Sequence, residues 1–222
     1  MNLDYDKNLA NHTRFHRLLN IKFMPRPIQA LIDSSALTHN LTIVRQLASK
    51  ARIMAVIKAD AYGHGLLQAA TALKDADGFA LLELDAAIAL RDAGFQHPIL
   101  LLEGFFSIEE LALFAQYRLS PVIHHTEQIA MLSASRYHHL DLFLKINTGM
   151  NRLGLPIDRF PSIIRTIIDH QYARNITLMT HFASADDPVE KQNVMMQLQR
   201  FHSVTQNFPY PRTLANSAAI IQ

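Results

Sequence analysis

The composition of this 222-residue chain is typical of a globular protein and excludes several classes of function. Hydrophobic residues make up 49% and charged residues 18%, which is enough to bury a core. A formal net charge of +2 leaves no large basic field for nucleic acid or an anionic membrane, and the absence of cysteine excludes disulfides, thiolate metal sites and a cysteine nucleophile.

Residues 1–26 are expected to form a loosely attached N-terminal extension. They lack clear periodicity and end at Pro25-Arg26-Pro27, whose restricted backbone favours extended structure. No apolar stretch there is long enough for a signal peptide or a membrane span, so a cytoplasmic protein is the default expectation.

Residues 27–222 are expected to form one α/β domain. Short apolar runs alternate with helical patterns about every 20 to 30 residues, as in a parallel sheet. Runs such as IMAVI and ILLL are apolar on both faces, so both faces should be covered, as in a (β/α)₈ TIM-type barrel or a doubly wound sheet. We expect seven strands, at residues 51–59, 77–84, 97–104, 119–125, 141–148, 175–184 and 212–219.

Seven units favour a barrel, although a closed one needs eight strands. The barrel is therefore expected to be incomplete, with the chain stopping before the last strand. The extended run QALIDS (residues 29–34) is either an eighth strand or an isolated one.

Three helical patterns carry local signals. One spans residues 84–93 and ends at Gly94, and another spans 107–116, where Ser107 and Glu110 have the spacing of a capping box. In a third, Met195, Met196, Leu198 and Phe201 are expected to form a buried stripe.

Polar residues end the apolar runs, and in a parallel barrel these strand ends share one face, where functional groups lie. Singly, most such residues are solvated, but their clustering predicts a site. Neighbouring histidines in the pairs 124/125 and 138/139 point to opposite faces of a strand, so we expect no metal site. The polar residues at the strand ends are Lys58, Glu83, Glu103, His124, His125, Lys145, His181, Asn216 and Ser217.

Lys58 has the clearest chemical potential of this set. It follows the run ARIMAVI and precedes a turn of small residues and glycines that lets backbone approach a ligand. A partly desolvated lysine at the mouth of a barrel has a lowered pKa and can attach covalently to an aldehyde, then act as a base. Spacing alone leaves a purely structural role for this lysine open.

The segment AVIKADAYGHG (residues 55–65) closely resembles the sequence around the pyridoxal-phosphate lysine of alanine racemases. Three further segments resemble that family in the same order, namely KINTGMNRLG (145–154), LMTHFASADDP (178–188) and ANSAAI (215–220). The resemblance runs from about residue 27 to residue 222. It implies a pyridoxal 5′-phosphate barrel that interconverts L-alanine and D-alanine, supplying D-alanine for peptidoglycan.

The resemblance also implies roles for cofactor-binding residues. Lys58 would hold the cofactor and act as the base on one face of the substrate. Tyr62 would bind the cofactor phosphate, His181 would lie against the pyridine ring, and Asn216 and Ser217 would help to hold the phosphate.

Three more positions match the family near the substrate. Arg152 would orient the substrate carboxylate and the cofactor phenolic oxygen, a role that suits its planar set of donors. Lys145 matches a lysine that is often carbamylated, and the resulting negative charge would position the arginine. Asn147 stands where many relatives carry Asp, which leaves the local hydrogen bonding open.

Racemisation also needs a second base on the opposite face of the substrate. In the family this is a tyrosine from the C-terminal domain of a partner subunit, so the resemblance implies a homodimer for the complete enzyme. Three interpretations stay open: an alanine racemase portion, a single-domain pyridoxal-phosphate protein of cofactor homeostasis, and an inactive racemase remnant. The sequence around each of five tyrosines does not match the segment that carries the second base in the family. These are Tyr5, Tyr117, Tyr137, Tyr172 and Tyr210.

Overall fold

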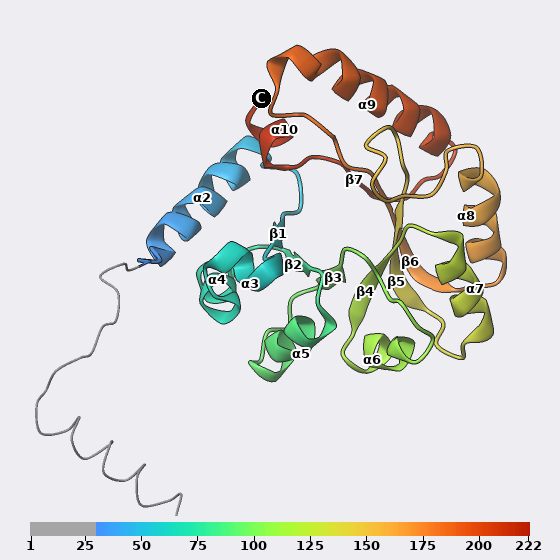
Figure 1. The fold of residues 1–222 in the computed structure, drawn as a ribbon, viewed down its shortest axis with the longest axis horizontal. Helices are drawn as coiled ribbons and strands as arrows, with labels where there is room; N and C mark the ends of the chain where they lie inside the picture. The colour runs from blue at the N-terminus through green and yellow to red at the C-terminus, as the bar shows by residue number, and fades with distance from the viewer. Residues whose placement is uncertain (1–29) are drawn as a thin grey trace, which may run out of the picture. The chain divides into compact units, whose positions relative to one another are not determined.

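A computed structural model describes residues 30–222, of which residues 33–222 form one compact unit. Seven strands make a single parallel sheet in sequence order, and helices cover its outer side (Figure 1). The expected seven strands are all confirmed, although each is shorter than its apolar run. They are β1 (Met54–Val56), β2 (Gly78–Leu81), β3 (Ile99–Leu101), β4 (Leu119–Ile123), β5 (Leu140–Lys145), β6 (Ala173–Met179) and β7 (Arg212–Thr213).

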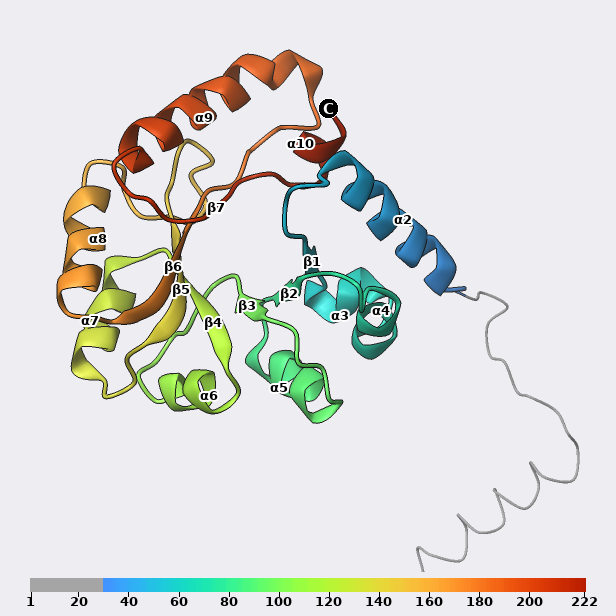
Figure 2. The ribbon, with the colours of Figure 1, turned by 180° about the vertical axis from the view of Figure 1, so that it is seen from behind.

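The helices follow the strands in alternation and form an outer arc when the ribbon is seen from either side (Figures 1 and 2). Among residues 30–222, none of them combines the length and apolar character needed to cross a bilayer. They are α2 (Ser34–Leu47), α3 (Lys58–Gly63), α4 (Leu66–Ala72), α5 (Leu84–Asp92), α6 (Glu110–Gln116), α7 (Thr126–Ala134), α8 (Phe160–Asp169), the 3-10 turn η1 (Pro188–Glu190), α9 (Lys191–Thr205) and α10 (Ser217–Ile221).

Alternate residues of strands β1 to β6 pack into two separate cores, as the period of two requires. Phe79 of β2 packs toward the helices in the large cluster, together with Leu90 of α5 and Ile164 of α8. Its neighbour Ala80 faces the concave side, where it packs with Leu100, Val122 and partly buried neighbours. Strands β2 to β4 are therefore buried on the concave face as well, as their apolar runs predict, whereas Val56 at the end of β1 is 42% exposed.

The sheet is curled but open, so this part of the chain forms an incomplete TIM-type barrel. Within residues 30–222, β1 pairs only with β2, and β7 pairs only with β6. Helix α10 packs beside α2 across the opening between these two edges (Figures 1 and 2).

The proposal of an eighth strand at QALIDS is wrong for its described part. Residues 30–33 form no strand, and α2 begins at Ser34. The Asp33 side chain accepts hydrogen bonds from the amides of Ser35 (2.8 Å) and Ala36 (3.2 Å). An Asp that caps a helix in this way ends the extended run that precedes it.

Two of the local helix signals met different outcomes. Helix α5 ends as predicted: Gly94, with φ +89°, donates to Arg91 O (2.9 Å), and Phe95 donates to Leu90 O (3.0 Å), which is a Schellman ending. The capping box at Ser107 is wrong, because α6 begins only at Glu110. The Glu110 carboxylate instead accepts from the amide of Phe106 (2.8 Å) and organises the turn before the helix.

The buried stripe expected on α9 is also partly wrong. Met195 and Met196 are 56% and 40% exposed, whereas Phe201 is fully buried. The buried face instead contains Gln197, the residue after Met196, which is 4% exposed. A polar side chain therefore occupies the buried position of α9 that hydrophobicity alone assigns to the neighbouring methionines.

Candidate functional site at the carboxyl ends of the strands

Four titratable side chains share one register at the carboxyl ends of the strands. Met54, Val122, Phe143 and Met179 face the concave side of the sheet. Counting in steps of two from these residues leads to Lys58 after β1, His124 after β4, Lys145 at the end of β5 and His181 after β6. By the same count Glu83, Glu103 and His125 fall on the opposite side of the sheet, so the register unites only part of the predicted set of polar strand ends. The site itself stays a prediction.

These groups are close enough to alter one another's ionisation. Burial lowers the pKa of Lys145, which is 8% exposed, and the charges of Arg152 and Lys58 lower it further, against the opposing effect of Glu103. Burial likewise lowers the pKa of His181, and the charges of Lys145, Arg152 and Lys58 lower it further. The cluster therefore holds three cations and a histidine that disfavours protonation, which is an environment suited to an anionic ligand.

His124 is the fourth member of this layer. Its Nε2 lies 3.0 Å from the carbonyl oxygen of Glu103, so this nitrogen carries the proton. Burial lowers the pKa of His124, the hydrogen bond to Glu103 O opposes the shift, and the charges of Lys145 and His125 add to it. His124 is thus a neutral ring beside Lys145, a placement that the sequence indicated without assigning a role.

The turn after Lys58 has an unusual backbone. Residues 59–62 of α3 all have φ between 51° and 56°, so this turn is left-handed. Such a conformation costs roughly 1 to 2 kcal/mol per residue for residues other than glycine. It is held by hydrogen bonds from Ala61 N to Ile57 O (3.0 Å) and from Gly65 N to Asp60 O (3.0 Å), and by Asp60 Oδ1, which accepts from Leu66 N (2.7 Å).

The left-handed turn places Tyr62 next to Lys58. The lysine Nζ lies 6.0 Å from the centroid of the tyrosine ring, and Tyr62 is 61% exposed. Strain of this kind persists where the surrounding structure enforces it, and it concentrates at functional sites.

Arg152 lies on a loop that Asn147 organises. Asn147 Oδ1 accepts from the amides of Gly149 and Asn151, both at 3.1 Å, and its Nδ2 donates to Asn151 Oδ1 (3.1 Å). The loop returns to the strand end through Leu155 N, which donates to Lys145 O (2.7 Å). An Asp at position 147 would accept the same two backbone amide bonds, and the Asn151 side chain would then have to present its amide nitrogen, not its oxygen, to residue 147.

The last two predicted site residues begin helix α10 after β7. Asn216 caps this helix, since its Oδ1 accepts from Ala219 N (3.0 Å), and Ser217 is the exposed first residue. The expectation of a strand to residue 219 is wrong, because β7 ends at Thr213 and the cap starts a helix. Both residues still follow a carboxyl strand end.

Two buried glutamines near the site were missed by the sequence reasoning. Gln128 on α7 accepts from His124 N (2.8 Å) and donates to Glu103 O (3.0 Å), tying the ends of β3 and β4. Gln197 on α9 donates to His181 O (3.0 Å). Each lies in an amphipathic helix after a strand, where its pattern is not distinguishable from that of a surface residue.

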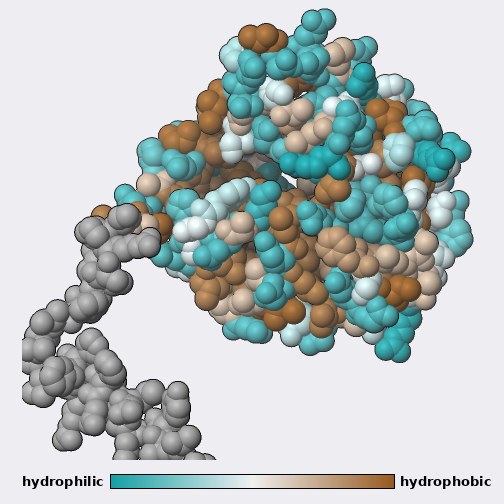
Figure 3. All heavy atoms as spheres, in the orientation of Figure 1, coloured by the Kyte–Doolittle hydropathy of each residue, from teal (hydrophilic) through white to brown (hydrophobic). Residues whose placement is uncertain are grey.

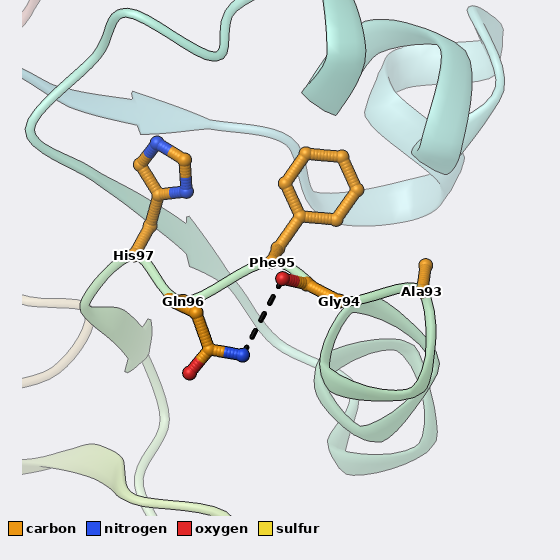
Figure 4. Close-up of a pocket in the computed structure, with 5 residues that line it drawn as sticks. All are labelled: Ala93, Gly94, Phe95, Gln96 and His97. Atoms are coloured by element: carbon orange, nitrogen blue, oxygen red, sulfur yellow. Dashed lines mark hydrogen bonds between the residues drawn. The ribbon is translucent and has the colours of Figure 1, made fainter.

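The space-filling view shows a hollow in the middle of the face, between the region of β7 and that of α3 (Figure 3). A separate shallow cavity of about 480 Å³ lies before β3, at the opposite ends of the strands, and is lined by residues 93–97 (Figure 4). His97 there bonds Lys74 O (2.7 Å). Within the described part of the chain, no group of three or more His, Cys, Asp or Glu side chains is arranged for a metal ion.

The fold and the site together define a barrel domain whose polar groups converge at the carboxyl ends of parallel strands. Residues 32–222 match the family model described as alanine racemase, N-terminal domain. The chain belongs to this family. The resemblance seen in the sequence is therefore confirmed over the whole sheet.

Individual relatives agree with this assignment. The alanine racemase of Nitrosospira multiformis is 58% identical over 200 residues, which cover 90% of this chain and 56% of the relative. The crystal structure of biosynthetic alanine racemase from Pseudomonas aeruginosa has a TM-score of 0.79 at 37% identity, covering 85% of this chain and 53% of that one. The Acinetobacter baumannii enzyme has a TM-score of 0.77 at 34% identity, covering 86% and 57%. The chain thus spans about half the length of the relatives it matches.

Proposed function

We propose that this chain is the pyridoxal 5′-phosphate barrel of an alanine racemase, with Lys58 as the cofactor lysine. The observation that carries the proposal is the convergence of Lys58, Lys145, Arg152 and His181, whose charges act on one another at the open face. A ligand with a phosphate and a phenolic oxygen supplies the negative charge that this cluster lacks. The residues present therefore fit the cofactor.

When bound, the cofactor draws electrons from the amino acid and makes its α-hydrogen acidic. The Lys58 amine, half-buried among other cations, is suited to hold the cofactor and then to take or return that proton on one face. Arg152 is suited to bind the substrate carboxylate and the phenolic oxygen through its planar donors. His181, kept neutral, is suited to lie against the pyridine ring without adding charge.

The phosphate is proposed to bind between two elements. Tyr62 is exposed beside Lys58 and has a free hydroxyl end for a phosphate oxygen. Asn216 and Ser217 open the short helix after β7, and their amide and hydroxyl groups suit the same anion.

Lys145 is proposed to be carbamylated. A lowered pKa increases the fraction of neutral amine, which attacks carbon dioxide and releases a proton to give a negatively charged carbamate. The product places a negative charge beside Arg152 and turns a repulsive contact into an attractive one. Among residues 30–222 no carboxylate forms an ion pair with the buried Lys145, although Glu103 attracts it, and the lowered pKa that results favours this modification.

The second base is proposed to come from a partner subunit in a homodimer. Among residues 30–222, the tyrosines other than Tyr62 pack with the helix-side core, and Tyr172 is 4% exposed there. None of these tyrosines is placed at Lys58. The natural substrate is proposed to be alanine, converted between its L and D forms in the cytoplasm.

Borohydride reduction in the presence of pyridoxal 5′-phosphate tests the cofactor assignment, because it makes a lysine–cofactor linkage permanent for peptide mapping. We expect the pyridoxyl group on Lys58, and its loss in Lys58→Arg but not in Lys74→Arg, a matched exposed control. A group on Lys74 or Lys145 instead, or none on a folded chain, contradicts the proposal.

Conversion of L-alanine to D-alanine distinguishes an alanine racemase portion from the other two interpretations. The chain joined to a racemase C-terminal region should turn over if the site is intact, and Lys58→Ala should abolish this. The chain alone should be slower by about 10² to 10⁴, because none of the tyrosines that pack with the helix-side core among residues 30–222 is placed to act as the second acid–base group. Cofactor binding without turnover by the joined chain would favour the remnant or the homeostasis protein.

A further inference from the structure

Gln197 is a buried amide whose orientation is fixed by its partners. Its Oε1 accepts from Ala183 N (3.0 Å), and its Nε2 donates to His181 O (3.0 Å) and to Thr148 Oγ1 (3.2 Å). A backbone N–H only donates and a carbonyl only accepts, so the two ends of the amide cannot be exchanged. One side chain on α9 therefore bonds the backbone at His181 and Ala183, after β6, and the loop after β5.

The bonds beyond Thr148 run in one direction. Thr180 Oγ1 donates its single proton to Ile146 O (3.0 Å), so in its 2.8 Å contact with Thr148 it must accept. Gln197, Thr148 and Thr180 thus form a buried relay that ends at the carbonyl next to Lys145. All three side chains are at most 4% exposed. Such a buried, fully satisfied network rigidifies the segments it joins.

The same loop is also held from the other side. Arg200, one turn further along α9, donates to Thr148 O (3.1 Å). A Cβ on Gly149 would meet Arg200 Nη1 at 3.1 Å and Gln197 Cγ at 3.5 Å, so the backbone at Gly149 is in close contact with side chains of α9. The turn at residues 148 and 149 is therefore fastened to α9, three residues before Arg152.

We propose that Gln197 is a positioning residue that holds the Arg152 loop and the His181 segment at one spacing. Thr148 lies between Lys145 and Arg152 along the chain, while His181 and Ala183 belong to the next strand end. Gln197 contacts both segments directly and lies behind the site on α9. Through them it sets where Arg152 and His181 meet an anionic ligand at Lys58, a consequence that rests on the proposed function.

The test compares four variants, each checked for folding by near-ultraviolet circular dichroism. Gln197→Leu removes all three amide bonds at similar volume, and Gln199→Leu makes the same change at an exposed position of α9. Thr148→Val removes the two hydroxyl bonds of Thr148, to Gln197 and to Thr180, while the bonds of Gln197 to His181 O and Ala183 N remain. Thr148→Ser retains the hydroxyl. Two quantities are measured: the pKa of His181 by NMR in the cofactor-free chain, and the rate at which pyridoxal 5′-phosphate becomes linked to Lys58.

In Gln197→Leu we expect the pKa of His181 to rise by about half a unit, a threefold change in proton affinity. The ring then moves away from the cations that face it, which are Lys145 of β5, Arg152 of the following loop and Lys58 of α3. The linkage rate should fall about tenfold, as misplacement of reacting groups predicts. Thr148→Val should slow linkage with a smaller pKa change, and Thr148→Ser and Gln199→Leu should resemble the unmodified chain.

A folded Gln197→Leu chain with unchanged His181 pKa and unchanged linkage rate overturns the proposal. If that variant does not fold, the Thr148 pair decides, and equal behaviour of its Val and Ser forms overturns the proposal. If the unmodified chain forms no linkage at Lys58, the proposed function fails. The cofactor-free pKa comparison then decides the positioning role independently.

Discussion

Replacing Lys145 with Met should increase the free energy of unfolding of the chain in carbon-dioxide-free buffer. Lys145 is 8% exposed, and its neighbours Arg152 and Lys58 repel it more than Glu103 attracts it. Its pKa is below the ordinary 10.5, so the unfolded chain binds the proton more tightly. The folded state therefore loses stability as the pH falls below 10.5, and the loss is complete below the folded pKa.

The magnitude follows from removing a buried charge that has no close partner. Replacing buried ionic groups by apolar ones of similar volume is often neutral or stabilising by about 1 to 4 kcal/mol, and we expect about 1 to 2 kcal/mol here. Urea denaturation at pH 7 measures it, and Lys50→Met, on an exposed turn, should change the value by less than about 0.5 kcal/mol. A loss of more than about 1 kcal/mol in Lys145→Met refutes the reasoning.

The same measurement in bicarbonate tests the carbamate. Carbamylated Lys145 carries a negative charge beside Arg152, so the unmodified chain should gain stability on adding bicarbonate. The Met variant has no amine at this position and should gain nothing. An equal response of both chains would show that the modification does not occur at Lys145.

Three further predictions concern other parts of the fold. Gly104→Ala should lower the free energy of unfolding by about 2 to 4 kcal/mol, because Gly104 has φ +70° and a Cβ would meet Val122 O at 2.3 Å; unchanged urea denaturation would contradict this. Acidification below pH 6.5 should destabilise the chain by up to about 1.4 kcal/mol per pH unit for each group, because burial lowers the pKa of His124 and His181; a His181→Asn chain should show a shallower pH dependence. The open edges of β1 and β7 should cause association at high concentration in sedimentation, which Val56→Lys on exposed β1 should reduce; a chain that stays monomeric contradicts this.

The strands and their order were predictable because a strand that is buried on both faces has a continuous apolar sequence, not an alternating one. Runs such as IMAVI and ILLL cannot face water on either side, and they recur at a spacing that fits one helix between strands. Polar residues that end such runs must lie at the same end of the sheet once the strands are parallel, because all carboxyl ends then meet there. The register that unites Lys58, Lys145 and His181 follows from those two facts.

The left-handed turn after Lys58 was not predictable from residue types. Ala59, Ala61 and Tyr62 have side chains that disfavour positive φ, so a propensity argument predicts an ordinary turn there. The hydrogen bonds that hold the turn are local: Ala61 N donates to Ile57 O, Gly65 N donates to Asp60 O, and Leu66 N donates to the Asp60 carboxylate. This combination of bonds, which single-residue preferences do not contain, sets the backbone at the residue pair proposed to hold the cofactor.

Gln128 and Gln197 were hidden for a different reason. The role of a buried amide can be recognised only when its partners are known. Gln128 bonds backbone groups 4 and 25 residues away, and Gln197 bonds groups 14, 16 and 49 residues away in the chain. The exposed neighbours Met195 and Met196 are more apolar than Gln197, so periodicity assigns the wrong face. Polar networks that bind loops together leave no periodic pattern.

Charges at the amino ends of the strands are arranged in the opposite way from those at the carboxyl ends. Asp77, just before β2, accepts from Ile53 N (2.8 Å) and from Arg45 (2.7 Å), and these bonds lower its pKa. Asp141, near the start of β5, pairs with Arg174 at 2.6 Å. Acids at this end have their partners in place and support the folded state above their lowered pKa values.

At the carboxyl ends, by contrast, burial and like charges lower the pKa of Lys145 and of His181. Bases whose pKa is lowered destabilise the folded chain at neutral or acidic pH, so this arrangement does not serve stability. In a parallel barrel the carboxyl end is the face where ligands bind. The pKa shifts are downward at both ends of the strands, but a lowered pKa stabilises the folded chain for the acids Asp77 and Asp141 and destabilises it for the bases Lys145 and His181. This contrast in stability supports the carboxyl ends as the candidate site for an anionic ligand, independently of any relative.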